Sequence, residues 1–177
     1  MTAYPTATVS QIALTDNTIA QLNQQMVLLY LGKPHISSAI HQQVIARFQA
    51  PPIAQQLLEP LRHIAHAGSI ALAQGNLVEY GLCMQKNTEA QRALHPMLIS
   101  ADVDAIIVLA QQYGALGWKV NGAGGDGGSL VVLCNDNPAQ RDALVANVQQ
   151  QLPHVQALPI RYSPHGVQVT VHTREEV

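Results

Sequence analysis

The chain has 177 residues, 47% of them hydrophobic, which is enough for one compact domain with its own core. Only 11% of the residues are charged and the formal net charge is -2, so the chain lacks the basic surface of a nucleic-acid-binding protein. No segment approaches the roughly 18 consecutive apolar residues of a membrane span, and the N-terminus lacks the pattern of a signal peptide. We therefore expect a cytoplasmic protein that binds neither nucleic acid nor membrane.

Strand and helix patterns follow one another along the first two thirds of the chain. Residues 7–14 alternate loosely and predict an edge strand that ends in a turn at Thr15-Asp16-Asn17. The apolar run QMVLLYLG, residues 25–32, predicts a strand buried on both faces. Four helices are then predicted from apolar residues at helical spacing and from proline or glycine at their ends, over residues 37–48, 53–74 with a bend near Pro60, 77–94 and 101–114.

The last third of the chain predicts more strands and one helix. Two strands, ALGWKVN and SLVVLC, flank a glycine-rich segment, and a helix follows from Pro138 to Leu152. Two short strands, residues 155–161 and 167–171, close the chain around the turn Ser-Pro-His-Gly. This order predicts an α+β fold in a single domain, residues 1–177: a ferredoxin-like sheet with helices on one face, plus an inserted helical segment over about residues 36–114.

The glycine-rich segment, GWKVNGAGGDGGSLVVLC over residues 117–134, places five glycines and one aspartate between two apolar runs. Two glycines usually suffice for a hairpin turn, so five favour a backbone that closely approaches a ligand or a neighbouring loop. The letters GAGGDG satisfy G-x-G-x-x-G, but a dinucleotide motif requires a helix next and SLVVLC predicts a strand. A Walker A motif is excluded because no Lys-Ser or Lys-Thr follows the glycines.

The cysteines and histidines give no pattern typical of a metal site. Cys83 and Cys134 each lie inside an apolar run and are predicted to be reduced thiols in the core. His63 and His66 lie three apart on one helical face, but no third ligand is placed to complete a zinc site. No metal site is therefore predicted. A histidine-based metal-binding protein is a weaker hypothesis than the two functions considered below.

Four segments carry a resemblance to a known family. ALGWKVNGAGGDGGSLVVL resembles the third conserved motif of the GHMP kinase superfamily, a G-a-K-x-S-G-A-G-G-G-G stretch near the chain end. MVLLYLGKPHISSAIHQQVI is similar to the L-Y-T-G-x-x-R strand and following helix of the fucokinase and heptose-phosphate kinase branch. ALAQGNLVEYGLCMQKNTEAQRAL resembles that branch's G-n-x-x-x-x-G helix, and IRYSPHGVQVTV its closing hairpin. The segments run in order from about Val9 to Val171.

The resemblance implies the ferredoxin-like C-terminal domain of a sugar kinase, whose glycine loop lies beside the phosphate-binding loop of an N-terminal domain. The superfamily's ATP loop and its usual catalytic Asp and Lys belong to that N-terminal domain, which we expect to be absent from this chain. Phosphoryl transfer needs several parts positioned at once, so this chain alone is expected to be inactive. With an N-terminal partner half, ATP and Mg²⁺ would bind and the γ-phosphoryl group would pass to a sugar or sugar phosphate.

The resemblance also carries over a candidate site, without any catalytic residue on this chain. The loop expected at the phosphate and substrate edge lies within residues 122–128 and its N-terminal neighbour, and consists of Asn121, Gly122, Ala123, Gly124, Gly125, Asp126 and Gly127. His35 and Lys119 are candidate substrate contacts. The chain departs from the motifs at Leu31 in place of Thr, His35 in place of Arg, Asn121 in place of Ser, and Asp126 in place of Gly. A carboxylate repels triphosphate, so Asp126 indicates contact with a metal or a sugar hydroxyl.

A different class of function stays open at the sequence level. Ferredoxin-like domains serve many unrelated roles, so the chain fits a non-catalytic, stand-alone binding or oligomerisation module as well. That alternative predicts self-association and no affinity for ATP. The neutral, weakly charged composition indicates a surface covered by another chain, either an N-terminal kinase half or a second copy in a homo-oligomer.

Overall fold

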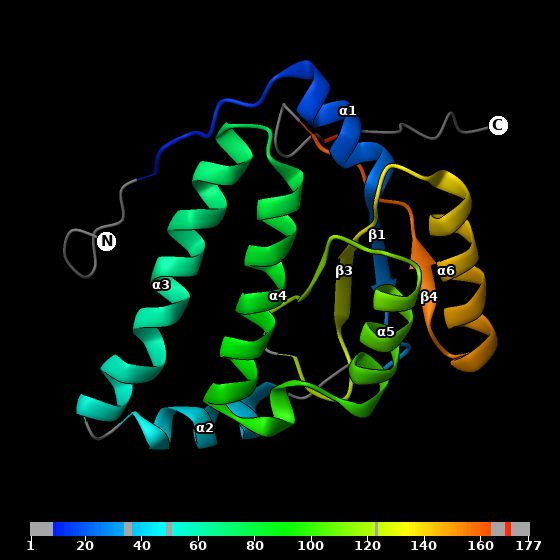
Figure 1. Cartoon of the computed structure of the whole chain (residues 1–177). Coiled ribbons are helices and arrows are strands. Elements are labelled where there is room, and N and C mark those ends of the chain that lie inside the picture. The colour runs from blue at the N-terminus through cyan, green and yellow to red at the C-terminus, as the bar shows by residue number, and fades with distance from the viewer. Residues whose placement is uncertain (1–8, 34–36, 49–50, 123, 164–168, 171–177) are drawn as a thin grey trace, which may run out of the picture.

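A four-stranded sheet with helices on both of its faces forms the fold (Figure 1). The structure is a computed structural model and describes residues 9–33, 37–48, 51–122, 124–163 and 169–170. In chain order its elements are α1 (Asp16–Gln25), β1 (Met26–Tyr30), α2 (Ser37–Arg47), α3 (Pro51–Ala73), α4 (Leu77–Leu94), the 3-10 turn η1 (Pro96–Leu98), α5 (Ala101–Gln112), β2 (Gly117–Val120), β3 (Ser129–Leu133), α6 (Pro138–Gln151) and β4 (Gln156–Leu158).

The strand order is β2-β3-β1-β4, and every neighbouring pair is antiparallel. Central strand β1 places Leu28 opposite Val131 of β3 and opposite Leu158 of β4. Helix α5 completes the connection from β1 to β2, a hairpin joins β2 to β3, and α6 connects β3 to β4. This is the β-α-β-β-α-β arrangement of a ferredoxin-like fold, with α2, α3 and α4 added before α5. The predicted fold class is confirmed.

Helices α5 and α6 cover one face of the sheet and form the main core with it. Successive side chains of a strand point to opposite faces, so alternate residues of β1 and β3 meet these helices. Leu29, Leu130 and Val132 are fully buried on this face. They belong to one cluster with Ile106 of α5 and Val148 of α6, which are also fully buried.

Helix α4 lies against the opposite face of the sheet, and α1 packs against the same face at one end. Val131 and Leu133 of β3 point to this side and cluster with Leu22 of α1 and with Leu77 and Met84 of α4. Helix α3 packs on α4 on the side away from the sheet (Figure 1). The inserted helices α3 and α4 therefore cover this face of the sheet.

The backbones of α4 and β2 touch at a pair of glycines. A Cβ on Gly117 would lie 2.2 Å from the Gly81 carbonyl oxygen, and a Cβ on Gly81 would lie 2.4 Å from the Leu116 carbonyl oxygen. Real Cβ atoms do not approach carbonyl oxygens so closely, so both positions require glycine. This contact fixes the place of α4 on the sheet.

The N-terminal prediction is wrong in its type of structure. Residues 9–14 have no regular secondary structure, and the turn predicted at Thr15-Asp16-Asn17 is instead the start of helix α1. Thr15 is the N-cap, with its hydroxyl accepting a hydrogen bond from the Thr18 N–H at 3.1 Å. Turn-forming residues and helix N-caps are the same residue types, which explains the error.

The other predicted elements lie where they were expected, with shifts of a few residues at their ends. Helix α3 begins at Pro51 and continues through Pro60 to Ala73. Strand β4 covers only three residues of the predicted 155–161, and residues 159–163 have no regular structure. The second strand of the predicted closing hairpin lies largely outside the described residues. None of the helices in the described ranges has the length and hydropathy needed to span a bilayer.

Candidate active-site loop

The glycine loop runs from Asn121 to Gly128, between β2 and β3. Its backbone has positive φ at Gly122, Gly124, Gly125 and Gly128. Gly124 shows why the sequence is so bare: its φ is +66°, and a Cβ there would lie 2.0 Å from the Leu98 carbonyl oxygen. The loop therefore approaches the η1 turn as closely as a backbone can. The prediction of close approach is confirmed for a neighbouring segment of the chain.

Backbone hydrogen bonds hold the loop at both of its ends and in its middle. The Gly125 N–H donates to the Leu98 carbonyl at 2.9 Å, and the Gly128 N–H donates to the Lys33 carbonyl at 3.2 Å. At the neck of the loop, the Asn121 side-chain amide donates to the Ser129 hydroxyl at 2.9 Å. The loop is thus fixed against the end of β1 and against η1.

Three side chains of helix α4, together with Lys119 of β2 itself, form a row that supports the start of the loop. Strand β2 is an edge strand, and an edge strand presents carbonyl groups that no other strand pairs. Here side chains donate to four alternate carbonyl oxygens along that edge: Gln85 Nε2 to Leu116 (2.8 Å), Thr88 Oγ1 to Trp118 (3.1 Å), Lys119 Nζ to Val120 (2.8 Å) and Gln91 Nε2 to Gly122 (3.2 Å). We call these four side chains the edge row. The edge row ends on the first glycine of the loop.

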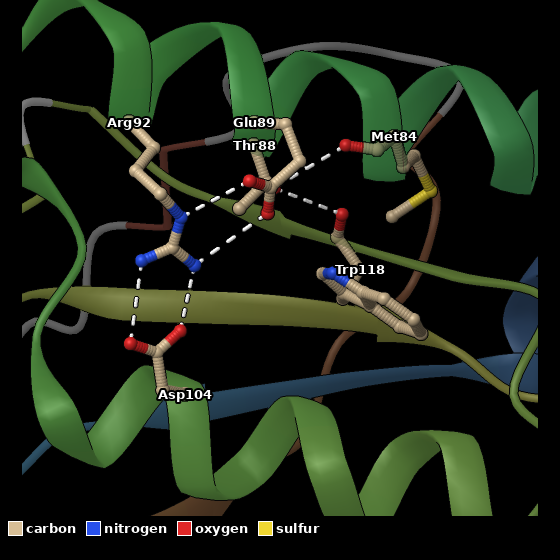
Figure 2. Close-up of polar contacts among 6 residues, drawn as sticks. All are labelled: Met84, Thr88, Glu89, Arg92, Asp104 and Trp118. Atoms are coloured by element: carbon tan, nitrogen blue, oxygen red, sulfur yellow. Dashed lines mark hydrogen bonds and ion pairs between the residues drawn. The ribbon is translucent and has the colours of Figure 1, made fainter.

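Thr88 is the buried centre of the edge row. Its side chain is fully buried, and its hydroxyl lies within hydrogen-bond distance of the Met84 carbonyl in its own helix as well as that of Trp118 (Figure 2). The two acceptors share one hydroxyl proton, at 3.3 Å and 3.1 Å. This residue links α4 to β2 without a charged group.

One turn further along α4, Arg92 joins α4 to α5. Its guanidinium donates to the Asp104 carboxylate at 2.6 Å and to Glu89 at 3.0 Å (Figure 2). Hydrogen bonding to Asp104, and then to Glu89, raises the pKa of Arg92. Asp104 lies in the first turn of α5, where a carboxylate is also favoured by the helix dipole. The pair lies on the surface beside the loop's supports.

The described part of the loop leaves several polar groups without a partner. No hydrogen bond within the described residues uses the backbone N–H groups of Gly124, Asp126 and Gly127, and Gly124 and Gly127 are buried. Backbone N–H groups without a protein partner can donate to an anion, which makes these groups candidates for an anion site. The Asp126 side chain is exposed at the loop tip and makes no ion pair with any described residue.

Lys119 lies below the loop, half-buried on the α4 face of the sheet. Besides the Val120 carbonyl, its ammonium contacts the Gln91 side-chain oxygen at 3.5 Å. Burial lowers the pKa of Lys119, because a charged amine loses hydration there. Lys119 therefore reaches the base of the loop through Gln91, which itself holds Gly122.

Other predicted positions are placed less fully. His35 and Ala123 lie outside the described residues. His63 and His66 are exposed on α3, where His63 Nε2 lies 3.0 Å from a Glu59 carboxylate oxygen. The described residues contain no group of three or more metal-ligating side chains. Sequence reasoning missed Gln85, Thr88 and Gln91, because no local pattern distinguishes them from other polar residues of a helix.

The comparisons with known proteins agree with this geometry. Residues 70–154, from the end of α3 to the turn before β4, match the family described as GHMP kinases C terminal. The chain is 27% identical over 145 residues to an L-fucokinase/L-fucose-1-P guanylyltransferase from Bacteroides fragilis, covering 81% of this chain and 15% of that protein.

Two solved structures share the fold. One is the mevalonate kinase of L. major in complex with R-mevalonate, with a TM-score of 0.65 and 25% identity, covering 84% of this chain and 44% of that one. The other is the phosphomevalonate kinase of Streptococcus pneumoniae, with a TM-score of 0.62 and 16% identity, covering 76% and 38%. The chain spans less than half the length of each of these relatives. The resemblance to the GHMP kinase superfamily is confirmed.

Proposed function

We propose that this chain, which carries the C-terminal domain of a GHMP kinase, supplies the glycine-loop side of an ATP-dependent small-molecule kinase and acts with an N-terminal half. The observation that carries the proposal is the loop itself. It is held by Leu98, Lys33 and Gln91, yet its amides at Gly124, Asp126 and Gly127 have no hydrogen-bond partner among the described residues. A fixed backbone with unused N–H groups suits a phosphate, because the donors need no reorganisation when the anion binds.

The residues present also fit the cofactors implied by the family. Mg²⁺ in kinases is held by one or two carboxylates together with phosphate oxygens, so a single loop carboxylate such as Asp126 is compatible with it. When bound, MgATP would supply the phosphoryl group. This chain would orient the phosphate oxygens through the loop amides and keep the loop in place through the edge row.

The substrate class we propose is a sugar or sugar phosphate. Support comes from the similarity to the L-fucokinase/L-fucose-1-P guanylyltransferase and from Asp126, whose exposed carboxylate can accept a hydrogen bond from a sugar hydroxyl. His35 and Lys119 are the further candidate contacts. Lys119 acts on the loop through Gln91 in the described geometry, so we propose a positioning role for it.

The test combines the chain with an N-terminal GHMP sugar-kinase half supplied in trans. ADP production from MgATP would be measured over a panel of sugars and sugar phosphates, for each half alone and for the mixture. We expect ADP production only in the mixture. Asp126→Asn should reduce it at least tenfold, whereas Asp136→Asn, an exposed aspartate at the other end of β3, should leave it unchanged.

Two results would overturn the proposal. If the mixture forms a stable complex that binds no MgATP by calorimetry, the loop is not part of a kinase site. If the chain instead self-associates in light-scattering measurements and never binds nucleotide, the non-catalytic oligomerisation module becomes the better account.

A further inference from the structure

A cavity of about 240 Å³ lies between α3, α4 and β2, on the face of the sheet that α4 covers. Its walls are mainly apolar and include Ile64 and Leu72 of α3 and Met84 of α4. The volume is below the range of drug-sized ligand pockets, so a nucleotide does not fit but a small molecule does. This cavity is distinct from the loop amides proposed above to bind phosphate.

Polar groups line this apolar cavity at Ser69, Tyr80, Asn87 and Lys119. The Tyr80 hydroxyl and the Asn87 side-chain amide have no hydrogen-bond partner among the described residues, and Lys119 forms part of the wall. Tyr80 and Asn87 lie seven residues apart, on one face of α4. An apolar pocket with a few converging polar groups is the usual form of a small-molecule site.

No carboxylate among the described residues balances the charge of Lys119. Its two recorded acceptors are a backbone carbonyl and a neutral amide oxygen, and no carboxylate of the described chain lies within 4.0 Å of its Nζ. A half-buried ammonium without a counter-ion favours an anionic ligand group. The third N–H of the ammonium has no recorded acceptor in the described chain.

We propose that this cavity binds a small amphiphilic carboxylate, with its alkyl chain among Ile64, Leu72 and Met84 and its carboxylate paired with Lys119. The site is independent of the proposed kinase activity. It is nevertheless connected to the glycine loop, because Lys119 contacts Gln91 and Gln91 donates to the Gly122 carbonyl. Ligand binding at Lys119 is therefore expected to alter the surroundings of Gly122 at the base of the loop.

Gly68 offers a way to fill the cavity without disturbing its walls. A Cβ at Gly68 would lie 3.6 Å from Cys83 Cβ and 3.8 Å from the Tyr80 ring, which is ordinary contact, so a larger side chain would extend into the cavity. Gly68→Leu is therefore the blocking variant. Ala67→Leu, at the preceding exposed position of α3, is its matched control.

The experiment is a titration of the full chain, without nucleotide, followed by two-dimensional ¹H–¹⁵N NMR. The probe is hexanoate, and 1-hexanol is its uncharged counterpart. Hexanoate should produce saturable shifts at Gly68, Cys83 and Lys119, with a smaller shift at Gly122. Lys119→Gln should weaken hexanoate about tenfold, the loss expected for one charge-assisted contact, and leave hexanol binding unchanged. Lys86→Gln, an exposed lysine on α4, should change neither.

Several outcomes would overturn the assignment. Equal binding of hexanoate and hexanol, or no effect of Lys119→Gln, would show that the ammonium takes no part. Undiminished hexanoate binding by Gly68→Leu would place the ligand elsewhere, and absence of any saturable shift would remove the site. Should Lys119→Gln fold poorly by its dispersion of amide signals, Gly68→Leu still decides the location.

Discussion

The two faces of the sheet bury different kinds of side chains. On the α5–α6 face, Leu29, Val132, Ile106 and Val148 are fully buried in one apolar cluster. On the α4 face, the apolar cluster is smaller, and beside it lie the edge row, a half-buried lysine and a cavity. The first face gains its stability from close packing, and the second places polar groups where the loop needs support.

This difference separates stability from loop positioning along one short strand. In β2, Trp118 and Val120 are buried on the α5–α6 face, whereas Lys119 between them points to the α4 face. The carbonyl groups of the same strand accept hydrogen bonds from α4. Substitutions on the two faces should therefore have different effects, and the following predictions order them from the largest effect to the smallest.

Truncation of a side chain on the α5–α6 face should cause the largest loss of stability. Ile106→Ala removes a fully buried side chain, and such substitutions destabilise proteins by about 2–5 kcal/mol. Leu72→Ala, on the half-buried wall of the cavity, should lose markedly less free energy of unfolding. Urea denaturation of both variants measures the difference, and equal losses would contradict the contrast between the faces.

Substitution at the contact between α4 and β2 should come next. Gly117→Ala places a Cβ against the backbone of Gly81, which has no flexible side chain that could move away, so we expect a loss of about 3 kcal/mol. Gly122→Ala is the control, because its φ is +60° but no atom lies within 4 Å of its Cβ. There only left-handed backbone strain applies, about 1 kcal/mol. Thermal unfolding of the two variants would distinguish the contact from the strain.

A buried cysteine on the α5–α6 face should also make the stability of the protein depend on alkaline pH. Burial raises the pKa of the Cys134 thiol to about 11 from its ordinary value of 9.0. Between pH 9 and 11 the unfolded chain loses this proton while the folded chain keeps it, so stability falls as pH rises, by on the order of 2 kcal/mol. Cys134→Ala should flatten the decline. A part should remain because burial also raises the pKa of Cys83.

On the α4 face, Lys119 should make stability depend on pH in the opposite sense, with a smaller amplitude. Burial lowers the pKa of Lys119 below 10.5, so the unfolded chain binds more protons in that window and this residue's contribution to stability rises with pH. Near pH 7, Lys119→Met should therefore be as stable as the parent, or more stable by less than about 1 kcal/mol. Any such advantage should disappear toward pH 10.5. Lys86→Met, exposed on α4, should show neither effect; a Lys119→Met variant clearly less stable at pH 7 would contradict the prediction.

Most of the fold could be predicted from the sequence because its elements carry strong local signals. The runs at β1 and β3 are continuously apolar, and prolines or glycines bound the long helices. Helix α1 escaped prediction because DNTIAQLNQQ has one buried leucine and begins with residues that also form turns. Its position depends on packing of Leu22 against the sheet, which no local pattern contains.

The candidate loop could be located in the sequence, whereas the contacts that hold it could be predicted only in part. Five glycines identified the loop, yet the carbonyl that approaches Gly124 belongs to Leu98, more than twenty residues earlier in the chain. The edge row was invisible because Gln85, Thr88 and Gln91 are typical of any polar helix face. Their partners become known only once β2 is known to be an edge strand.

The glycine pair Gly81 and Gly117 has a consequence for how related sequences can diverge. Residues in contact usually change together, since a larger side chain on one side is offset by a smaller one on the other. Here each side already has no side chain, and each missing Cβ faces the other segment's backbone, so no compensating replacement exists. In an alignment of homologues, these coupled positions should therefore show no covariation and should remain glycine together.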